Sequence, residues 1–142
     1  MFDYFALEID KIQPSQLYIS KRKLKAVQKI FDPLDTDLES FGVIPIKELN
    51  GEIIFVDGHT RALVAYLAGM EKINVFWETE ELDWEMYEIC VQWCKEAGIL
   101  SITDLESRII PHDDYEILWY KRCKDAQQKL AEERKKRDKI KE

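Results

Sequence analysis

The sequence predicts an α+β fold: a small mixed sheet with helices, followed by an all-helical C-terminal extension. Short apolar runs typical of strands all lie before residue 80. The pair Asn50-Gly51 between two of these runs is a strong hairpin signal. After Glu78 the apolar residues recur at helical spacing up to the charged C-terminus. The 142 residues are enough to bury one hydrophobic core without disulfides or metals.

The first part of the chain is predicted to contain a strand and then a helix. Apolar and polar side chains alternate over residues 4–12 well enough to predict a strand, and this strand stops at Gln13-Pro14. A helix is expected after Ser20, whose hydroxyl can accept a hydrogen bond from an amide of the first turn. Asp32-Pro33 ends this helix.

An acidic loop follows the first helix. The spacing of Asp35 and Asp37 is that of a calcium-binding loop. Such a loop needs glycine at its sixth position and glutamate at its twelfth, where this chain has Ser40 and Ile46. The sequence therefore does not predict a calcium site.

The middle of the chain is predicted to form a hairpin, a helix and a further strand. Asn50-Gly51 supplies the two-residue hairpin turn. After Asp57-Gly58 the chain enters a helix with an apolar side, and Gly69 ends that helix. The three strands predicted here cover residues 44–49, 52–56 and 73–77.

The last third of the chain is predicted to be helical. Asp83 is expected to cap a helix that Gly98 closes. Thr103–Glu106 has the spacing of a capping box and starts a short helix. Asp113 or Asp114 is expected to cap the last helix, which runs into the charged tail.

Charge is distributed unevenly along the chain, whose net charge is −7. Residues 121–142 carry 10 Lys/Arg and 5 Asp/Glu, or +5, so the first 120 residues carry 11 basic and 23 acidic groups, or −12. Because phosphates repel an acidic body, nucleic-acid binding is not expected. The basic tail is either a solvated helix end or a contact for an acidic partner.

The composition favours a cytoplasmic protein. No apolar run approaches the roughly 20 residues that a membrane span needs. The first ten residues contain acidic side chains and no basic one, unlike a signal peptide. The chain has only three cysteines, an odd number, whereas the disulfide framework of a secreted protein needs more cysteines and an even number of them.

The segment Asp57-Gly58-His59-Thr60-Arg61 carries the main functional signal, because it lies where a strand passes into a helix. Gly58 permits a sharp turn, and the unpaired amides of the first helical turn suit a phosphate. Arg61 can donate two parallel hydrogen bonds to phosphate oxygens, and His59 and Thr60 add donors. Asp57 can accept a proton or help to hold Mg²⁺. The alternative is purely structural, namely a cap, a turn residue and a surface ion pair.

Residues 7–77 resemble the ParB/sulfiredoxin-like fold. The order is shared: a strand ending near IQPSQ, a helix, the segment PIKELNGEIIFVDGHTRALVAYLAG, and the strand INVFW. Sulfiredoxins have a catalytic cysteine in this motif, but His59 matches it here and the first cysteine is Cys90. Partition-type ParB proteins have a GERR-like motif and a following helix-turn-helix domain, neither of which is readable in this chain.

The motif is most similar to the DGHxR hallmark of free serine kinases, matched by Asp57, Gly58, His59 and Arg61. This resemblance implies transfer of a phosphoryl group from ADP or ATP, with Mg²⁺, to the hydroxyl of L-serine or another small metabolite. It implies a phosphate site made of Gly58, His59, Thr60 and Arg61, with Asp57 and His59 as catalytic candidates. Gln16 stands where those kinases have a catalytic glutamate, so it is expected to contact substrate but cannot accept a proton.

The sequence is compatible with two functional classes. The full DGHxR match favours a kinase, whereas Gln16 favours a non-catalytic, nucleotide-responsive regulator or adaptor related to ParB N-terminal domains. The expected division is a nucleotide-binding domain over residues 1–80 and a helical extension over 81–142, whose helices are candidates to meet a protein partner. A nuclease is not favoured, because no set of clustered metal ligands is readable and the body is acidic.

The cysteines and tryptophans have simpler interpretations. Cys90 and Cys94 lie on one helical face, where His112 and Cys123 could complete a zinc site, but no CxxC pair supports it. Buried free thiols are the expected state. The four tryptophans are expected in the core and between helices: Trp77, Trp84, Trp93 and Trp119.

Overall fold

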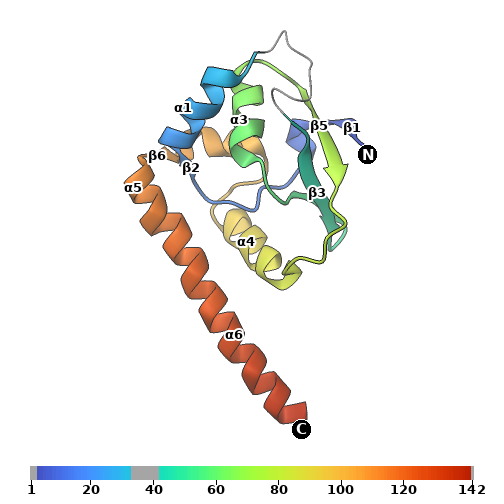
Figure 1. Ribbon diagram of the computed structural model, residues 1–142, viewed down its shortest axis with the longest axis vertical. Coiled ribbons are helices and arrows are strands. Elements are labelled where there is room, and N and C mark those ends of the chain that lie inside the picture. Colours follow the sequence, from blue (N-terminus) through green and yellow to red (C-terminus); the bar gives the residue numbers. More distant parts are fainter. Residues whose placement is uncertain (1–2, 33–41, 142) are drawn as a thin grey trace.

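The computed structural model describes residues 3–32 and 42–141, and it confirms the mixed α+β architecture with a helical C-terminal part. The acidic loop with Asp35 and Asp37 lies outside the described residues. Figure 1 shows the sheet and its helices packed together, with the last helix running away from this body.

One four-stranded sheet forms the centre of the first half, with the strand order β1-β5-β3-β4. The pair β3–β5 is parallel, and the other two pairs are antiparallel. The helix between β4 and β5 therefore lies in the connection that returns the chain to the far side of β3. The strand bounds are β1 Phe5–Glu8, β3 Ile44–Leu49, β4 Glu52–Phe55 and β5 Lys72–Trp77.

The hairpin was predicted correctly, and the first strand is shorter than predicted. Leu49 pairs with Glu52 across Asn50 and Gly51, both of which have positive φ, as a type I′ turn requires. The first strand ends at Glu8 because the chain then forms the short 3₁₀ helix η1, Ile9–Lys11.

Two predicted helix starts are confirmed by their caps. Helix α1, Lys21–Ile30, begins after Ser20, whose Oγ accepts a hydrogen bond from the Lys23 amide at 3.3 Å. Helix α4, Trp84–Glu96, begins after Asp83, which accepts from the Met86 amide at 3.2 Å. Both side chains satisfy amides that a helix N-terminus leaves unpaired.

Two other predicted caps are wrong. The capping box is formed by Ser101 and Asp104, two residues before the predicted start, and it opens the 3₁₀ helix η2, Ile102–Arg108. Asp104 Oδ2 accepts from the Ser101 amide at 3.1 Å, whereas the Thr103 hydroxyl instead hydrogen bonds Ser101 Oγ at 2.8 Å. The last helix starts at His112 after Pro111, so Asp113 and Asp114 lie within its first turn and neither caps it.

The last helical run is continuous from His112 to Lys141. It consists of α5, His112–Tyr115, the π-helical segment η3, Glu116–Lys121, and α6, Arg122–Lys141. Its start is fixed by a short parallel pair that the sequence did not predict, β2 Ile19–Ser20 with β6 Ile109–Ile110.

One hydrophobic core includes residues from both halves of the chain, such as Phe55, Leu63 and Leu105, which are fully buried. The predicted division at residue 80 stays a prediction.

Cys90 and Cys94 are buried and free, as expected. Trp119 is buried and its ring meets that of Trp93 edge-on at 6.2 Å between centroids. Trp77 is 44% exposed at the end of β5, so its assignment to the core was wrong. No described helix is long and apolar enough to cross a membrane.

Candidate functional site

The turn between β4 and helix α3, His59–Leu67, depends on Gly58. This residue has φ of 81° and lies directly before the helix. A Cβ at this position would lie 2.9 Å from Ile44 Cγ2 and 3.1 Å from Arg61 Nη2. Left-handed backbone and close approach together require glycine here. The Gly58 amide donates to Asp57 Oδ1 at 2.7 Å, which holds the Asp57 carboxylate at the turn.

The N-terminus of α3 has no side-chain cap. Ser20 and Asp83 cap α1 and α4, but Gly58 has no side chain with which to accept from the first turn of α3. The cap residue therefore supplies no oxygen to the first-turn amides, which lie at the positive end of the helix dipole. This is the local arrangement that binds anions at helix N-termini.

Arg61 places its guanidinium beside this turn. A Cβ on Gly42 would lie 2.8 Å from Arg61 Nη1, and one on Gly58 would lie 3.1 Å from Nη2, so both glycines leave room for the guanidinium. Burial lowers the pKa of Arg61 and the Asp57 carboxylate partly counters this effect. Arginine nonetheless stays protonated at neutral pH, so the side chain supplies a fixed, forked positive charge.

His59 is buried, with 3% of its surface exposed. Its Nε2 accepts a hydrogen bond from the Ser15 amide at 2.9 Å. The centroid of its ring lies 5.1 Å from the centroid of the Phe55 ring. Burial lowers the pKa of His59 to about 4, although Asp57 acts in the opposite direction. The imidazole is therefore neutral at pH 7, with its proton on Nδ1. In this geometry its ring joins α3 to the Ser15 segment, and Nε2 is not available as a proton acceptor.

The structure brings every predicted site residue to one pocket of about 360 Å³. Thr60, half-buried, and Asp57, exposed, lie at this pocket with the arginine. Gln16 reaches it from the segment after Pro14, 41 positions before Asp57 in the chain. The predicted members that line the pocket are Gln16, Asp57, Gly58, His59, Thr60 and Arg61.

Sequence reasoning missed two polar residues of this pocket, Lys23 and Tyr115. Lys23 Nζ hydrogen bonds the Tyr120 hydroxyl and lies 5.2 Å from the centroid of the Tyr115 ring. Tyr115 accepts a hydrogen bond at its hydroxyl from Gln16 Nε2 at 3.1 Å, and burial raises its pKa. The basic face of α1 hinted at Lys23, but no local pattern places Tyr115 beside Gln16.

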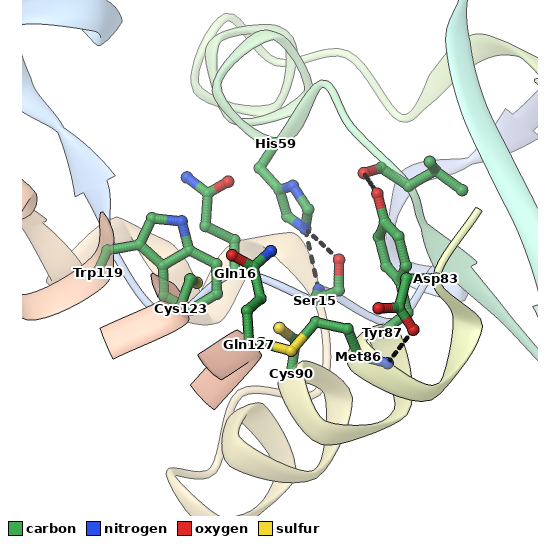
Figure 2. A pocket seen from close by; sticks show the side chains of 11 residues that line it. Ser15, Gln16, His59, Asp83, Met86, Tyr87, Cys90, Trp119, Cys123 and Gln127 are labelled. Carbon is green, nitrogen blue, oxygen red and sulfur yellow. Dashed lines mark hydrogen bonds between the residues drawn. The ribbon is translucent and has the colours of Figure 1, made fainter. Parts of the chain in front are cut away.

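A second cavity, of about 210 Å³, adjoins the first and shares Gln16 and His59 with it (Figure 2). It lies between α4 and the last helical run, and its walls include Met86, Trp119 and Gln127. The C-terminal helices therefore contribute to the surroundings of the predicted site.

No three His, Cys, Asp or Glu side chains gather into a metal-binding cluster among the described residues. Asp57 is the one carboxylate among the described residues that line the first pocket. A Mg²⁺ ion bound here would thus take most of its ligands from water and from the phosphates of a bound molecule, which is its usual behaviour at nucleotide sites.

Comparisons with known proteins give structural matches only. No protein-family model and no curated protein matches the sequence. The structure is similar to protein Atu1540 from Agrobacterium tumefaciens, with a TM-score of 0.44 and 13% identity over 72% of this chain. It is also similar to a C-terminally truncated chromosome-partitioning protein ParB from Caulobacter crescentus, complexed with CTP-gamma-S, with a TM-score of 0.45 and 16% identity over 68% of this chain. The matches span 61% and 53% of those two chains, respectively.

Proposed function

We propose that the pocket at the start of α3 binds the phosphate groups of a nucleotide. The observation that carries this proposal is the position of the Arg61 guanidinium beside Gly42 and Gly58, at a helix start without a side-chain cap. A forked cation beside the positive end of a helix matches the tetrahedral oxygens of a phosphate.

Lys23 supports a ligand with more than one phosphate. Its ammonium group lines the same pocket as Arg61 but comes from α1. Two positive side chains on different walls suit a diphosphate or triphosphate better than a single carboxylate. The resemblance of Asp57–Arg61 to the DGHxR motif points to a nucleotide as the molecule that carries those phosphates.

The finer proposal is phosphoryl transfer from ADP or ATP, with Mg²⁺, to the hydroxyl of L-serine or a similar metabolite. Asp57 is the group that can accept the hydroxyl proton as the new O–P bond forms and the bond to the departing nucleotide breaks. His59 then acts as a positioning residue, because its Nε2 is held by the Ser15 amide. Arg61 would neutralise the charge that develops on the transferred group.

A second candidate function is nucleotide binding without transfer, as in a regulator or adaptor. Gln16 favours it, because a carboxamide stands where the kinases have a glutamate, and its Nε2 is engaged with Tyr18 O at 2.8 Å and Tyr115 Oη at 3.1 Å. Such a carboxamide binds and orients a neighbour but transfers no proton.

Calorimetric titration with ADP, ATP and CTP, each with Mg²⁺ and with or without L-serine, tests the binding proposal. We expect saturable binding of at least one nucleotide, and no binding of any would contradict the proposal. Multiple-turnover assays for O-phosphoserine then separate the two candidates. Turnover in the wild type that is lost in Asp57→Asn, with nucleotide affinity retained, supports the kinase; tight binding without turnover supports the regulator.

A further inference from the structure

The cavity between α4 and α6 is placed to receive part of the same ligand. It adjoins the phosphate pocket across Gln16 and His59, which line both spaces. Figure 2 shows the His59 ring at one side of this cavity and the side chains of α4 and of the last helical run at the other. A ligand whose phosphates lie at α3 therefore has a second compartment within reach.

The walls of this cavity suit a flat apolar ring. The Trp119 indole and the Met86 thioether are 7% and 6% exposed, so each is held firmly by its neighbours. The Tyr87 ring lines the same space, and its hydroxyl donates to Val56 O at 3.1 Å. Indole faces and thioether sulfur both make favourable contacts with aromatic rings.

Two carboxamides offer polar contacts to the edge of such a ring. Both hydrogens of Gln16 Nε2 are engaged by Tyr18 and Tyr115, which leaves Oε1 as an acceptor. Gln127 reaches into the cavity from α6, with both donor and acceptor capacity (Figure 2). Amide groups of this kind pair with the donors and acceptors at the edge of a nucleobase.

The charge of the cavity argues against an amino acid in it. Asp83 is the one carboxylate among its described lining residues, and it is already bonded to Arg134 at 2.6 and 3.1 Å and to the Met86 amide. His59 is neutral. The ammonium and carboxylate of a zwitterion would lose water here without gaining an opposite charge, whereas an uncharged heterocycle has no such cost.

We infer that this cavity binds the nucleobase of the nucleotide whose phosphates bind at the start of α3. The inference rests on the proposed function and adds that α6 forms part of the nucleotide site. The ribose would cross the Gln16–His59 boundary, and a small phosphoryl acceptor such as serine would bind on the phosphate side rather than between α4 and α6.

Adjacent glutamines on α6 provide a matched test. Gln127 lines the cavity, whereas Gln128 does not. Affinities of the full chain for Mg²⁺-ATP, Mg²⁺-CTP and Mg²⁺-tripolyphosphate are measured in the wild type, Gln127→Ala and Gln128→Ala. We expect the preferred nucleotide to bind the wild type at least about tenfold tighter than tripolyphosphate, because stacking and edge contacts add to the phosphate contacts. Gln127→Ala should weaken nucleotide binding by about threefold to tenfold and leave tripolyphosphate binding unchanged.

The outcomes separate the two proposals. Equal affinity for tripolyphosphate and nucleotides in the wild type would overturn the base site and leave the phosphate site standing. A nucleotide preference that Gln127→Ala leaves intact, or that Gln128→Ala reduces equally, would also overturn the base site. Absence of binding by all three ligands, together with no binding of ADP in the calorimetric titration, would overturn the proposed function itself, and with it this inference.

Discussion

His59 shows how one residue can connect a predicted motif to the fold. Its imidazole accepts a hydrogen bond from the amide of Ser15, which lies 44 positions earlier in the sequence. This contact brings the segment that contains Gln16 to the start of α3. Loss of the acceptor would leave a buried amide unsatisfied, which costs about 1–3 kcal/mol. The motif position that the resemblance assigned to chemistry is thus also a structural link.

The neutral state of His59 predicts a pH-dependent stability. Its pKa is about 4 in the folded chain, against an ordinary value of 6.5, so the unfolded chain binds more protons between these values. The free energy of unfolding should therefore be fully retained above pH 6.5 and should fall by about 3 kcal/mol as the pH drops toward 4. His59→Gln keeps an acceptor for Ser15 but does not titrate. Urea denaturation between pH 7.5 and 4 should show a shallower decline in this variant, and identical declines would contradict the assignment.

Gly58 should be the more costly of two comparable glycines to replace. Gly58 and Gly69 have φ of 81° and 90°, but an added Cβ meets Ile44 at 2.9 Å in the first case and nothing within 4 Å in the second. Gly69→Ala should lower the free energy of unfolding by about 1 kcal/mol through backbone strain alone. Gly58→Ala should lower it by about 1–3 kcal/mol more, because the added Cβ clashes with a packed side chain. Chemical denaturation measures both, and equal losses would show that the close approach is unimportant.

The three free thiols should react at different rates. A hydrogen bond from the Cys90 thiol, together with the charge of Arg122, lowers the pKa of Cys123. The same hydrogen bond and burial raise the pKa of Cys90, and burial raises that of Cys94 to about 12. Because the thiolate is the reactive form, iodoacetamide at pH 7.5 should label Cys123 first. Mass spectrometry of the labelled peptides checks the order; labelling of Cys94 at the same rate would contradict it.

At the scale of single elements, local sequence predicted well where a local interaction decides the structure. Asn50-Gly51 fixes the hairpin, and Ser20 and Asp83 fix two helix starts. Prediction failed where competing caps lay close together. Thr103 and Ser101 both carry hydroxyls, and the geometry at Asp104 selected Ser101. The start of the last helix was missed because β6 and Pro111, rather than an aspartate, determine it.

Asp83 combines two roles that substitutions can separate. Its carboxylate caps α4 and pairs with Arg134 of α6, and both contacts lower its pKa. Asp83→Ala should lose the cap, which contributes about 1 kcal/mol to stability. Asp83→Asn keeps a capping oxygen and loses only the charge. Amide hydrogen exchange should become faster around Arg134 in both variants.

The first turn of α4 distinguishes the two variants. It should exchange faster in Asp83→Ala only, because asparagine is as good a cap as aspartate. High salt should make exchange around Arg134 faster in the wild type, since it screens the exposed pairs of Arg134 with Asp83 and Glu85. Unchanged exchange around Arg134 in both variants would mean that this pair does not hold α6.

At the scale of the whole molecule, the features that sequence could not supply are the long-range ones. The five residues from Asp57 to Arg61 were identified as a site because they are contiguous. The contact of Gln16 with Tyr115 spans 99 positions, and no periodicity encodes it. The parallel pair of β2 with β6 and the exposure of Trp77 likewise depend on how distant elements pack.

The charge distribution also has an explanation at this scale. The basic C-terminal run was expected to be solvated or to meet an acidic partner. Within this run, Arg134 and Arg137 pair with the acidic start of α4 in the same chain, through Asp83 and Glu85, and most of the other side chains are exposed. Part of the positive charge of the C-terminal run thus neutralises acidic side chains in the first part of the same chain.

The most direct test of the phosphate site is the affinity of an Arg61→Ala variant for the nucleotide that the wild type prefers. Arg22→Ala removes an exposed charge from α1, outside the described pocket lining, and serves as the control. A forked arginine–phosphate contact predicts that Arg61→Ala loses at least about tenfold in affinity while the variant still folds, and that Arg22→Ala loses little affinity. Equal affinities of the wild type and Arg61→Ala for the nucleotide would contradict the assignment of this pocket to phosphate.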